Sequence, residues 1–288
     1  MSKTRMPWWI KLIISIVSVA FGLVIAFGGM CIFVKVKYDI NLVKTIYQVT
    51  VVAQEVNAEE KFPKYIREED MGPAMNDIND IIPDLITYSE ANGYEVGTPS
   101  GSMSGDLALT ERRVGALLTM LLNSSADASI SIAGKNIAFS LYEVSFSNIT
   151  EKSADFGVTI KLDIRDIKKE MDFWPASYIA NKIPNNIYVK SIVTITKGEN
   201  PFEYTTSSKG LSINNLDETE TQEFLKALNS FVKFGSIEDL NNSLAGTFAN
   251  ALIGSEESSG FAYSLKGLDA VDYAFETKES GNLFIVKK

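Results

Sequence analysis

The chain has 288 residues, with 36 acidic and 27 basic side chains, one cysteine and no histidine. The absence of histidine excludes a Ser-His-Asp triad, a Cys-His nucleophile pair and a histidine-containing zinc site. A single cysteine excludes an intramolecular disulfide, so the burial of apolar side chains must stabilise the fold.

The first apolar segment is long enough to cross a bilayer. Residues 12–34 form a run of 23 positions without a charged side chain. As a helix, such a run reaches roughly 35 Å. Aromatic and basic residues that suit the membrane interface flank it, namely Trp8, Trp9, Lys11, Lys35 and Lys37. We therefore expect a single-pass anchor in the cell membrane through residues 12–34.

A cleaved signal peptide is the alternative interpretation of this segment. Ala20-Phe21-Gly22 and Ala26-Phe27-Gly28 both offer the small residues of a cleavage site. Either cut leaves Met30 to Val34 as an exposed apolar start, which favours an uncleaved anchor. The short leading tail favours a cytoplasmic N-terminus and an extracytoplasmic C-terminal part, although the basic residues on the two sides of the span balance.

Charge divides the chain at residue 37. Residues 1–37 carry five basic and no acidic side chains, which leaves 22 basic and 36 acidic side chains, a net charge of −14, in residues 38–288. This acidic part argues against binding nucleic acid, or anionic lipid headgroups, by bulk charge.

Residues 38–104 are predicted to form a stalk, a helical segment and a linker. Residues 40–56 place Ile40, Val43, Ile46 and Tyr47 on a helical stripe. A second helical pattern follows Asp70, and the Gly- and Ser-rich residues 97–105 are typical of a flexible linker. We therefore expect three regions: an anchor in 1–37, this connecting region in 38–104, and an extracytoplasmic domain in 105–288.

The predicted domain combines helices and strands. A helix capped by Thr110 carries an apolar stripe that includes Leu118, a second begins near Thr219 with capping-box spacing to Gln222, and a third runs from Ser236 to Gly254. About eight alternating segments predict strands, around 137–141, 144–146, 156–164, 187–189, 193–195, 261–265, 271–275 and 283–285. The strands come in runs, so we expect an α+β fold in which a curved antiparallel sheet has amphipathic helices on one face.

Motifs for catalysis are absent from the sequence. There is no phosphate-binding glycine loop, and Gly101-Ser102-Met103-Ser104-Gly105 has methionine where a nucleophile elbow needs a hydroxyl. Asp77, Asp80 and Asp84 lie on one helical face but lack the pattern of a calcium loop, and a solvated face explains them. We therefore expect no cofactor, no metal ion and no catalytic residue, while an enzyme that uses carboxylates, or Ser230 with Lys233 at Ser-x-x-Lys spacing, stays a minor alternative.

A polar-aromatic stretch is the most distinctive part of the domain. Residues 173–184 predict a short helix bounded by Pro175 and Pro184. Its aromatic side chains either cap the core of the sheet or form the entrance to an apolar groove beneath the helices. On the second interpretation, the candidates for contact with a hydrophobic ligand are Leu118, Phe173, Trp174, Tyr178 and Phe231.

The order of these segments resembles a known group of proteins. An N-terminal anchor, the helix start Leu109-Thr110-Glu111-Arg112-Arg113, alternating strands, and an aromatic helix leading into Ile187-Tyr188-Val189 are similar to uncharacterised single-pass envelope proteins of Gram-positive bacteria, including the YpmS-like family. The resemblance covers about residues 105–200 and implies a tubular lipid-binding type of fold, with no catalytic residue to carry over. Residues 40–104 and 217–253 depart from the shorter family pattern, so the ligand stays open.

Two functions follow as hypotheses. The first is a non-catalytic extracytoplasmic protein that binds a lipid, an acyl chain or another hydrophobic envelope component between its helices and sheet. The second is a structural or scaffolding ectodomain that recruits an envelope protein partner. A lipid groove and a dry core use the same Leu, Ile, Val and Phe side chains, so the sequence leaves open whether the interior is hollow or solid.

Overall fold

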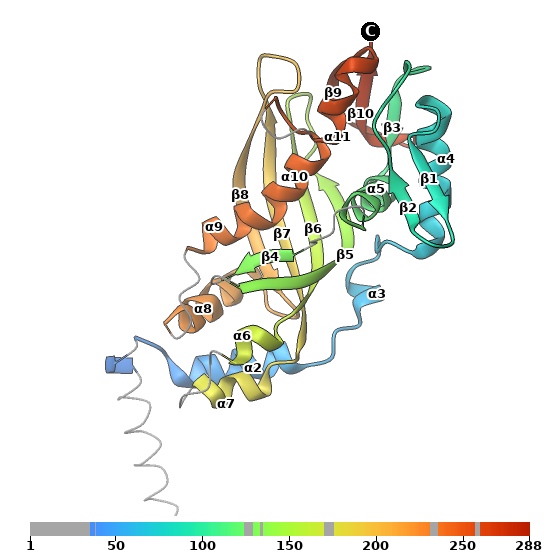
Figure 1. Cartoon of the computed structure of the whole chain (residues 1–288). Coiled ribbons are helices and arrows are strands. Elements are labelled where there is room, and N and C mark those ends of the chain that lie inside the picture. The colour runs from blue at the N-terminus through green and yellow to red at the C-terminus, as the bar shows by residue number, and fades with distance from the viewer. Residues whose placement is uncertain are drawn as a thin grey trace, which may run out of the picture.

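The chain forms an α+β fold of antiparallel sheets with helices packed against them (Figure 1). A computed structural model describes residues 35–37, 39–123, 129–132, 135–169, 176–230, 236–256 and 260–288. Within these residues the predicted fold class is confirmed, although the strands form three sheets instead of one.

The largest sheet has five strands, which follow one another in chain order as an antiparallel meander. Its strands are β4 (Ser129–Ile132), β5 (Lys135–Ser147), β6 (Ser153–Asp163), β7 (Asn186–Lys197) and β8 (Tyr204–Ile213). Residues directly opposite each other share a face, so Leu162 with Ile187 and Ile160 with Val189 define an apolar inner face. The register shifts at Tyr142 of β5 and Lys209 of β8 are β-bulges, which bend and twist these strands.

Two small sheets complete the β-structure. The first has the order β3 (Leu107–Leu109), β10 (Gly281–Lys287), β9 (Ala270–Lys278). The second is the hairpin of β1 (Ile86–Ser89) and β2 (Gly93–Val96). The three-stranded sheet joins segments far apart in the sequence, because the C-terminal strand β10 pairs with β3.

One predicted strand is wrong. Residues 261–265 form the helix α11 (Phe261–Ser264) and the start of the 3-10 turn η3 (Leu265–Leu268). Phe261 and Leu265 are both buried, and their spacing of four residues also places them on one face of a helix. The alternation of three apolar residues therefore could not separate a short strand from a single helical turn.

Two helices cover the inner face where β5 and β6 pair. The first is α5 (Glu111–Asn123), which contacts β5 and whose Arg113 N–H lies 3.4 Å from the Thr110 hydroxyl, as the predicted cap requires. The second is α10 (Thr247–Leu252), which is followed two residues later by the predicted stop, Gly254, with φ +75°. Behind α5 lie η1 (Glu68–Asp70) and α4 (Met71–Ile81), linked to it by an Arg113–Asp77 ion pair of 2.6 Å.

Three further elements cover the rest of the inner face: α8 (Glu218–Asn229), α9 (Ile237–Asn241) and the π-helical turn η2 (Asn242–Gly246). The capping box of α8 joins Asp217 and Glu220, two residues before the predicted pair of Thr219 and Gln222. Both pairs have the same spacing, but Asp217 has the extended backbone that a cap needs, and its carboxylate accepts the Glu220 N–H at 2.7 Å.

The residues predicted as a stalk form a helix that is part of the packed fold. The helix α2 (Leu42–Ala53) contacts α7 (Ala176–Lys182) and α8, and its Val49 and Val52 belong to the same hydrophobic cluster as the sheet. The short helix α6 (Arg165–Lys169) lies beside α2 and α7, and the short helix α3 (Ala58–Lys61) lies on the segment that leads from α2 to α4 (Figure 1). The domain boundary predicted at residue 104 therefore crosses a shared core.

The predicted membrane span, residues 12–34, lies outside the described residues, as do Trp8, Trp9 and Lys11. Among the described helices, none has both the length and the apolar composition needed to cross a bilayer. Lys35 and Lys37 are described and both are exposed. The anchor thus stays a prediction from the sequence.

Candidate hydrophobic binding site

An apolar pocket of about 80 Å³ lies on the inner face of the large sheet, beside α2 and α8. Its floor comes from the ends of three strands: Leu162, Ile187, Val189, Leu211 and Ile213. Its walls come from α2, α8, α9, η2 and the residues beside α6 and α7: Val52, Ile164, Ile183, Phe224, Leu225, Leu228, Leu240 and Leu244. Every one of these side chains is apolar.

The sequence pattern explains why these side chains converge. Strand alternation turns Ile187 and Val189 of β7 toward the same face as their partners in β6 and β8. In α8, spacings of one and four residues place Phe224, Leu225 and Leu228 on one stripe, which faces this floor.

The wall formed by α2 is held by a buried asparagine. The Asn214 side-chain amide donates to the Val52 carbonyl at 2.8 Å, and its oxygen accepts the Tyr188 N–H at 2.7 Å. Asn214 has φ 48°, a left-handed conformation that asparagine tolerates better than most residues. Farther along α2, the Gln48 amide donates to the Glu220 carbonyl of α8 at 3.1 Å. These bonds fix the end of α2 over the sheet.

The chemistry of the pocket limits what it can hold. Since no lining side chain is polar, a charged or strongly polar group placed there would lose its hydration without gaining a hydrogen bond from a side chain. The volume is about half that of the roughly 150 Å³ engineered cavity that admits benzene. The pocket therefore suits the end of an acyl chain or a small apolar group, and is too small for a whole lipid.

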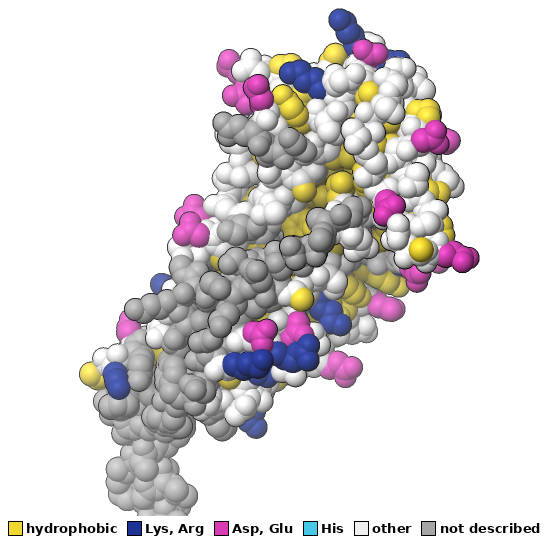
Figure 2. All heavy atoms as spheres, in the orientation of Figure 1, with side chains coloured by type: hydrophobic (Ala, Val, Ile, Leu, Met, Phe, Trp, Pro, Cys, Tyr) yellow, Lys and Arg dark blue, Asp and Glu magenta, His cyan; other side chains and the backbone are white. Residues whose placement is uncertain are grey.

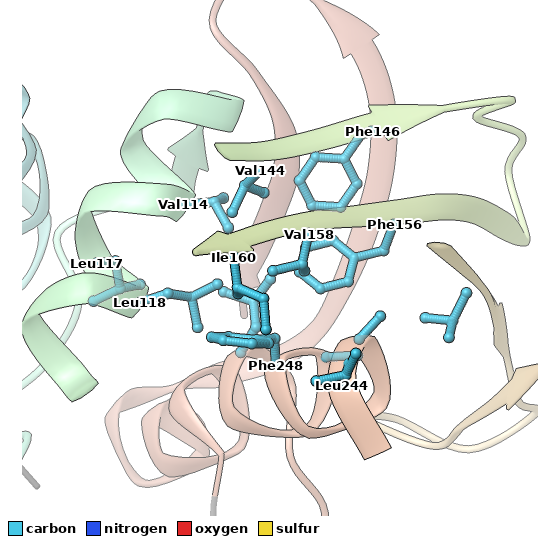
Figure 3. Packing of buried hydrophobic residues seen from close by; sticks show 14 of the residues in the cluster. Val114, Leu117, Leu118, Val144, Phe146, Phe156, Val158, Ile160, Leu244 and Phe248 are labelled. Atoms are coloured by element: carbon cyan, nitrogen blue, oxygen red, sulfur yellow. The ribbon is translucent and has the colours of Figure 1, made fainter. Parts of the chain in front are cut away.

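The interior beneath α5 has a different character. Figure 3 shows Leu118 of α5 pointing toward Ile160 and Phe248, and Val114 of the same helix facing Val144. Phe139 and Phe248 meet edge to face with centroids 5.7 Å apart, and the rings of Phe146 and Phe156 lie 5.3 Å apart. Leu118 is 1% exposed and does not line the pocket, so this ligand candidate belongs to the packed core.

The remaining ligand candidates are placed only in part. Phe173, Trp174 and Phe231 lie outside the described residues. Tyr178 lies in α7, but its side chain is also outside the described set. The predicted aromatic helix does border the pocket, because Ile183, which directly follows α7, is one of the residues that line the pocket.

Sequence reasoning identified the apolar face of α8 but did not connect it to a cavity. Phe224, Leu225 and Leu228 are the stripe that follows the capping box, whereas Val52 comes from a segment interpreted as a stalk. In the sequence, Val52 is marked only by the apolar character of the segment that forms α2, which extends over more than one side of that helix. The spacing of residues along the chain does not show which distant side chains lie next to Val52.

A polar groove lies on the other side of the α2–α8 contact. It has a volume of about 290 Å³ and is lined by Lys35, Asp39, Lys44, Glu223 and Lys226, among other residues. Lys44 and Glu223 form an ion pair of 2.5 Å across the two helices. The hydrogen bond from Lys35 and its charge lower the pKa of Asp39. Three lysines and two carboxylates leave this groove with an excess of one positive charge.

Two buried carboxylates lie on the opposite, outer face of the sheet. Glu143 accepts hydrogen bonds from the Lys64 N–H at 3.1 Å and the Thr159 hydroxyl at 3.4 Å. Asp155 accepts from Asn148 at 2.5 Å and Thr194 at 2.7 Å and pairs with Lys209. Burial raises the pKa of Asp155, but the hydrogen bonds from Asn148, Lys209 and Thr194 outweigh it and lower the pKa overall.

These environments favour a structural role for both carboxylates. A general acid needs a carboxyl whose pKa is raised by an apolar site, which is the reverse of Asp155. Within the part of the chain that the structure describes, no group of three or more acidic or cysteine side chains could hold a metal ion. Asp77 is instead paired with Arg113. On the face shown in Figure 2, most basic side chains lie beside acidic ones.

Comparisons with family models, curated proteins and solved structures return no match for this chain. The resemblance to envelope proteins of the YpmS-like type therefore stays a prediction.

Proposed function

We propose that this chain is a membrane-anchored extracytoplasmic protein of a bacterial envelope that binds the end of an acyl chain, without catalysis. The observation that carries the proposal is the pocket whose lining is apolar throughout, at the end of the sheet where α2 enters the fold. An acyl chain is an envelope component whose terminus matches both the size and the chemistry of this pocket.

The position of the pocket relative to the predicted anchor supports a lipid ligand. Seven residues separate Val34, the end of the predicted span, from Leu42, the start of α2. Even fully extended, this connection reaches no more than about 28 Å. The end of the domain that carries the pocket is thus held near the bilayer, where acyl chains are concentrated.

Lipid binding by the full chain provides the test. The protein is purified in a mild detergent, and co-purifying lipids are measured by native mass spectrometry and by solvent extraction. We expect a bound lipid or fatty acid in the wild type and its loss in Val189→Phe, because the larger side chain fills the pocket. Val271→Phe, at an exposed position of β9, is the matched control and should retain the ligand.

A scaffolding ectodomain that recruits an envelope protein remains the second candidate function. It predicts a wild-type protein without bound lipid and a Val189→Phe variant with unchanged crosslinking partners in cells. Absence of any lipid from the wild type, together with such a partner, would decide for scaffolding.

A further inference from the structure

The helix α2 is apolar on two sides. Its inward side buries Leu42, Thr45, Gln48, Val49 and Val52. The opposite side carries Val43, 58% exposed, and Tyr47, 59% exposed, with the exposed Thr50 as their polar neighbour. Lys44 is the only charged residue in the helix. The solvent side of a helix on a folded domain is normally charged or polar, so this second apolar side lacks the usual pattern.

Exposed apolar side chains concentrate at this end of the described chain. The large hydrophobic residues with high exposure are Val36, Val43, Tyr47, Tyr88 and Val271. Three of these five lie within 12 consecutive positions, from Val36 to Tyr47. Scattered single apolar residues need no explanation, but a group on one segment marks an interaction surface.

We propose that this outer side of α2 rests on the surface of the bilayer. We call it the α2 patch, and it consists of Val36, Val43 and Tyr47 with the neighbouring lysines Lys35, Lys37 and Lys44. The inference depends on the anchoring proposed above, because a span ending at Val34 brings α2 within a short chain of the membrane. Tyrosine and lysine suit the headgroup level, and an amphipathic helix lies in the plane of the interface with its apolar side down.

The charge around the α2 patch is compatible with this contact. The part of the chain after residue 37 has a net charge of −14, which disfavours an anionic surface as a whole. Near the patch, however, Asp39 pairs with Lys35 and Glu223 pairs with Lys44. The contact thus depends on burial of Val43 and Tyr47 in the interface, so it should form on zwitterionic membranes and strengthen only modestly with anionic lipid.

Such a contact would set the orientation of the domain. Val52 at the far end of α2 forms part of the pocket wall, while Lys44 and Lys226 line the polar groove on the adjacent side of α8. With the outer side of α2 on the bilayer, the pocket lies on the inward side of the same helix, within about one helix diameter, roughly 10 Å, of the lipid headgroups. The α2 patch therefore places the proposed acyl-chain pocket beside its source of ligand.

The test measures the membrane depth of single labels on the full chain. The chain has one cysteine, Cys31, which is replaced by serine before a new cysteine is placed at Tyr47. The matched control is Tyr88→Cys, because Tyr88 is 58% exposed, nearly the same as Tyr47, and lies in β1. Each variant carries an environment-sensitive fluorophore in phosphatidylcholine vesicles that contain lipids with a spin-label quencher at the headgroup or upper acyl chain.

We expect lipid quenching at position 47 to exceed that at position 88 by several-fold. Equal, weak quenching at the two positions overturns the proposal. Shielding of position 47 from a water-soluble quencher without lipid quenching also overturns it, and indicates a protein partner or a second copy on the patch. A label on the native Cys31 reports the anchor separately, so failure of the α2 patch and failure of the proposed membrane anchoring give different results.

Discussion

The two ends of the large sheet both bury apolar side chains, but they differ in the kind of side chain and in how closely it packs. Where α5 covers the sheet, phenylalanine rings from β5, β6 and α10 fill the space between the layers (Figure 3). Where α2 and α8 cover it, the lining is almost entirely aliphatic, with Phe224 as its one aromatic ring, and a pocket of about 80 Å³ remains.

The approach of the helices also differs between the two ends. At Gly115 of α5 an added Cβ would lie 2.6 Å from Ile66, so only glycine allows the close contact seen there. At the other end, α2 and α8 are held by side chains that bond to backbone carbonyls, as Asn214 does to Val52. Hydrogen bonds of this kind fix a helix in place without filling the space beneath it. Total hydrophobicity therefore does not decide whether a core is solid.

The largest expected effect comes from deleting a side chain in the solid end. Leu118→Ala should lower the free energy of unfolding by about 4 kcal/mol, because the packed surroundings cannot collapse into the new cavity. Leu225→Ala, in the pocket wall, should cost about 2 kcal/mol, since part of its surroundings is already empty. Urea denaturation of the full chain in detergent measures both. Equal losses would contradict the distinction between the two ends.

Removal of the asparagine that holds the pocket wall should have the next largest effect. Asn214→Ala leaves the Val52 carbonyl and the Tyr188 N–H without their partner and places alanine at φ 48°. We expect a loss of about 3 kcal/mol in the free energy of unfolding. Hydrogen exchange should show α2 opening first. Ser212→Ala, two residues earlier and on the outer face of β8, serves as the control with a small effect.

The next test adds side-chain volume instead of removing it, and again compares the packed end of the sheet with the end that holds the pocket. Val193→Phe should lower the free energy of unfolding by about 2 kcal/mol, because Val193 is fully buried in the packed part of β7. Val189→Phe, four residues earlier on the same face, should leave stability nearly unchanged, since the ring enters the pocket. Thermal unfolding of the two variants provides the measurement. If Val189→Phe lost as much stability as Val193→Phe, the pocket would have no room for the added ring.

The smallest expected effect is a dependence of stability on pH. It arises from Asp155, on the outer face of the sheet, opposite the solid end. The pKa of Asp155 is lowered in the fold from its ordinary value of 3.8, so its contribution to stability is present above that pH. This contribution is lost as the pH falls below about 4, toward the lowered pKa of the folded state. Asp155→Asn should cost about 1.5 kcal/mol at neutral pH. The difference from the wild type should disappear in acid, as denaturation at a series of pH values can show.

Local patterns predicted most of the elements. The stripe of α5, the capping-box spacing before α8 and the alternation in β6 each depend on neighbours within one segment, so they are visible in the sequence. The errors have local causes as well: three alternating apolar residues at 261–265 suit a helical turn equally well, and two overlapping capping boxes precede α8. The strands β1 to β4 and β8 were not predicted as strands. Each of β1 to β4 spans only three or four residues, and the ten residues of β8 are mostly polar or glycine, with few apolar side chains to reveal the alternation.

The sequence by itself determined most of the longer helices, the strands β5, β6, β7, β9 and β10, the apolar segment at 12–34, the division of charge at residue 37 and the lack of histidine chemistry. Tertiary structure alone decided that Leu118 belongs to a solid core, that α2 is part of the fold, and that Val52, Ile183 and Leu225 surround one pocket. The physical reason is that composition and periodicity specify which face of a segment is buried. The fit between side chains from distant segments then determines whether the buried space is filled.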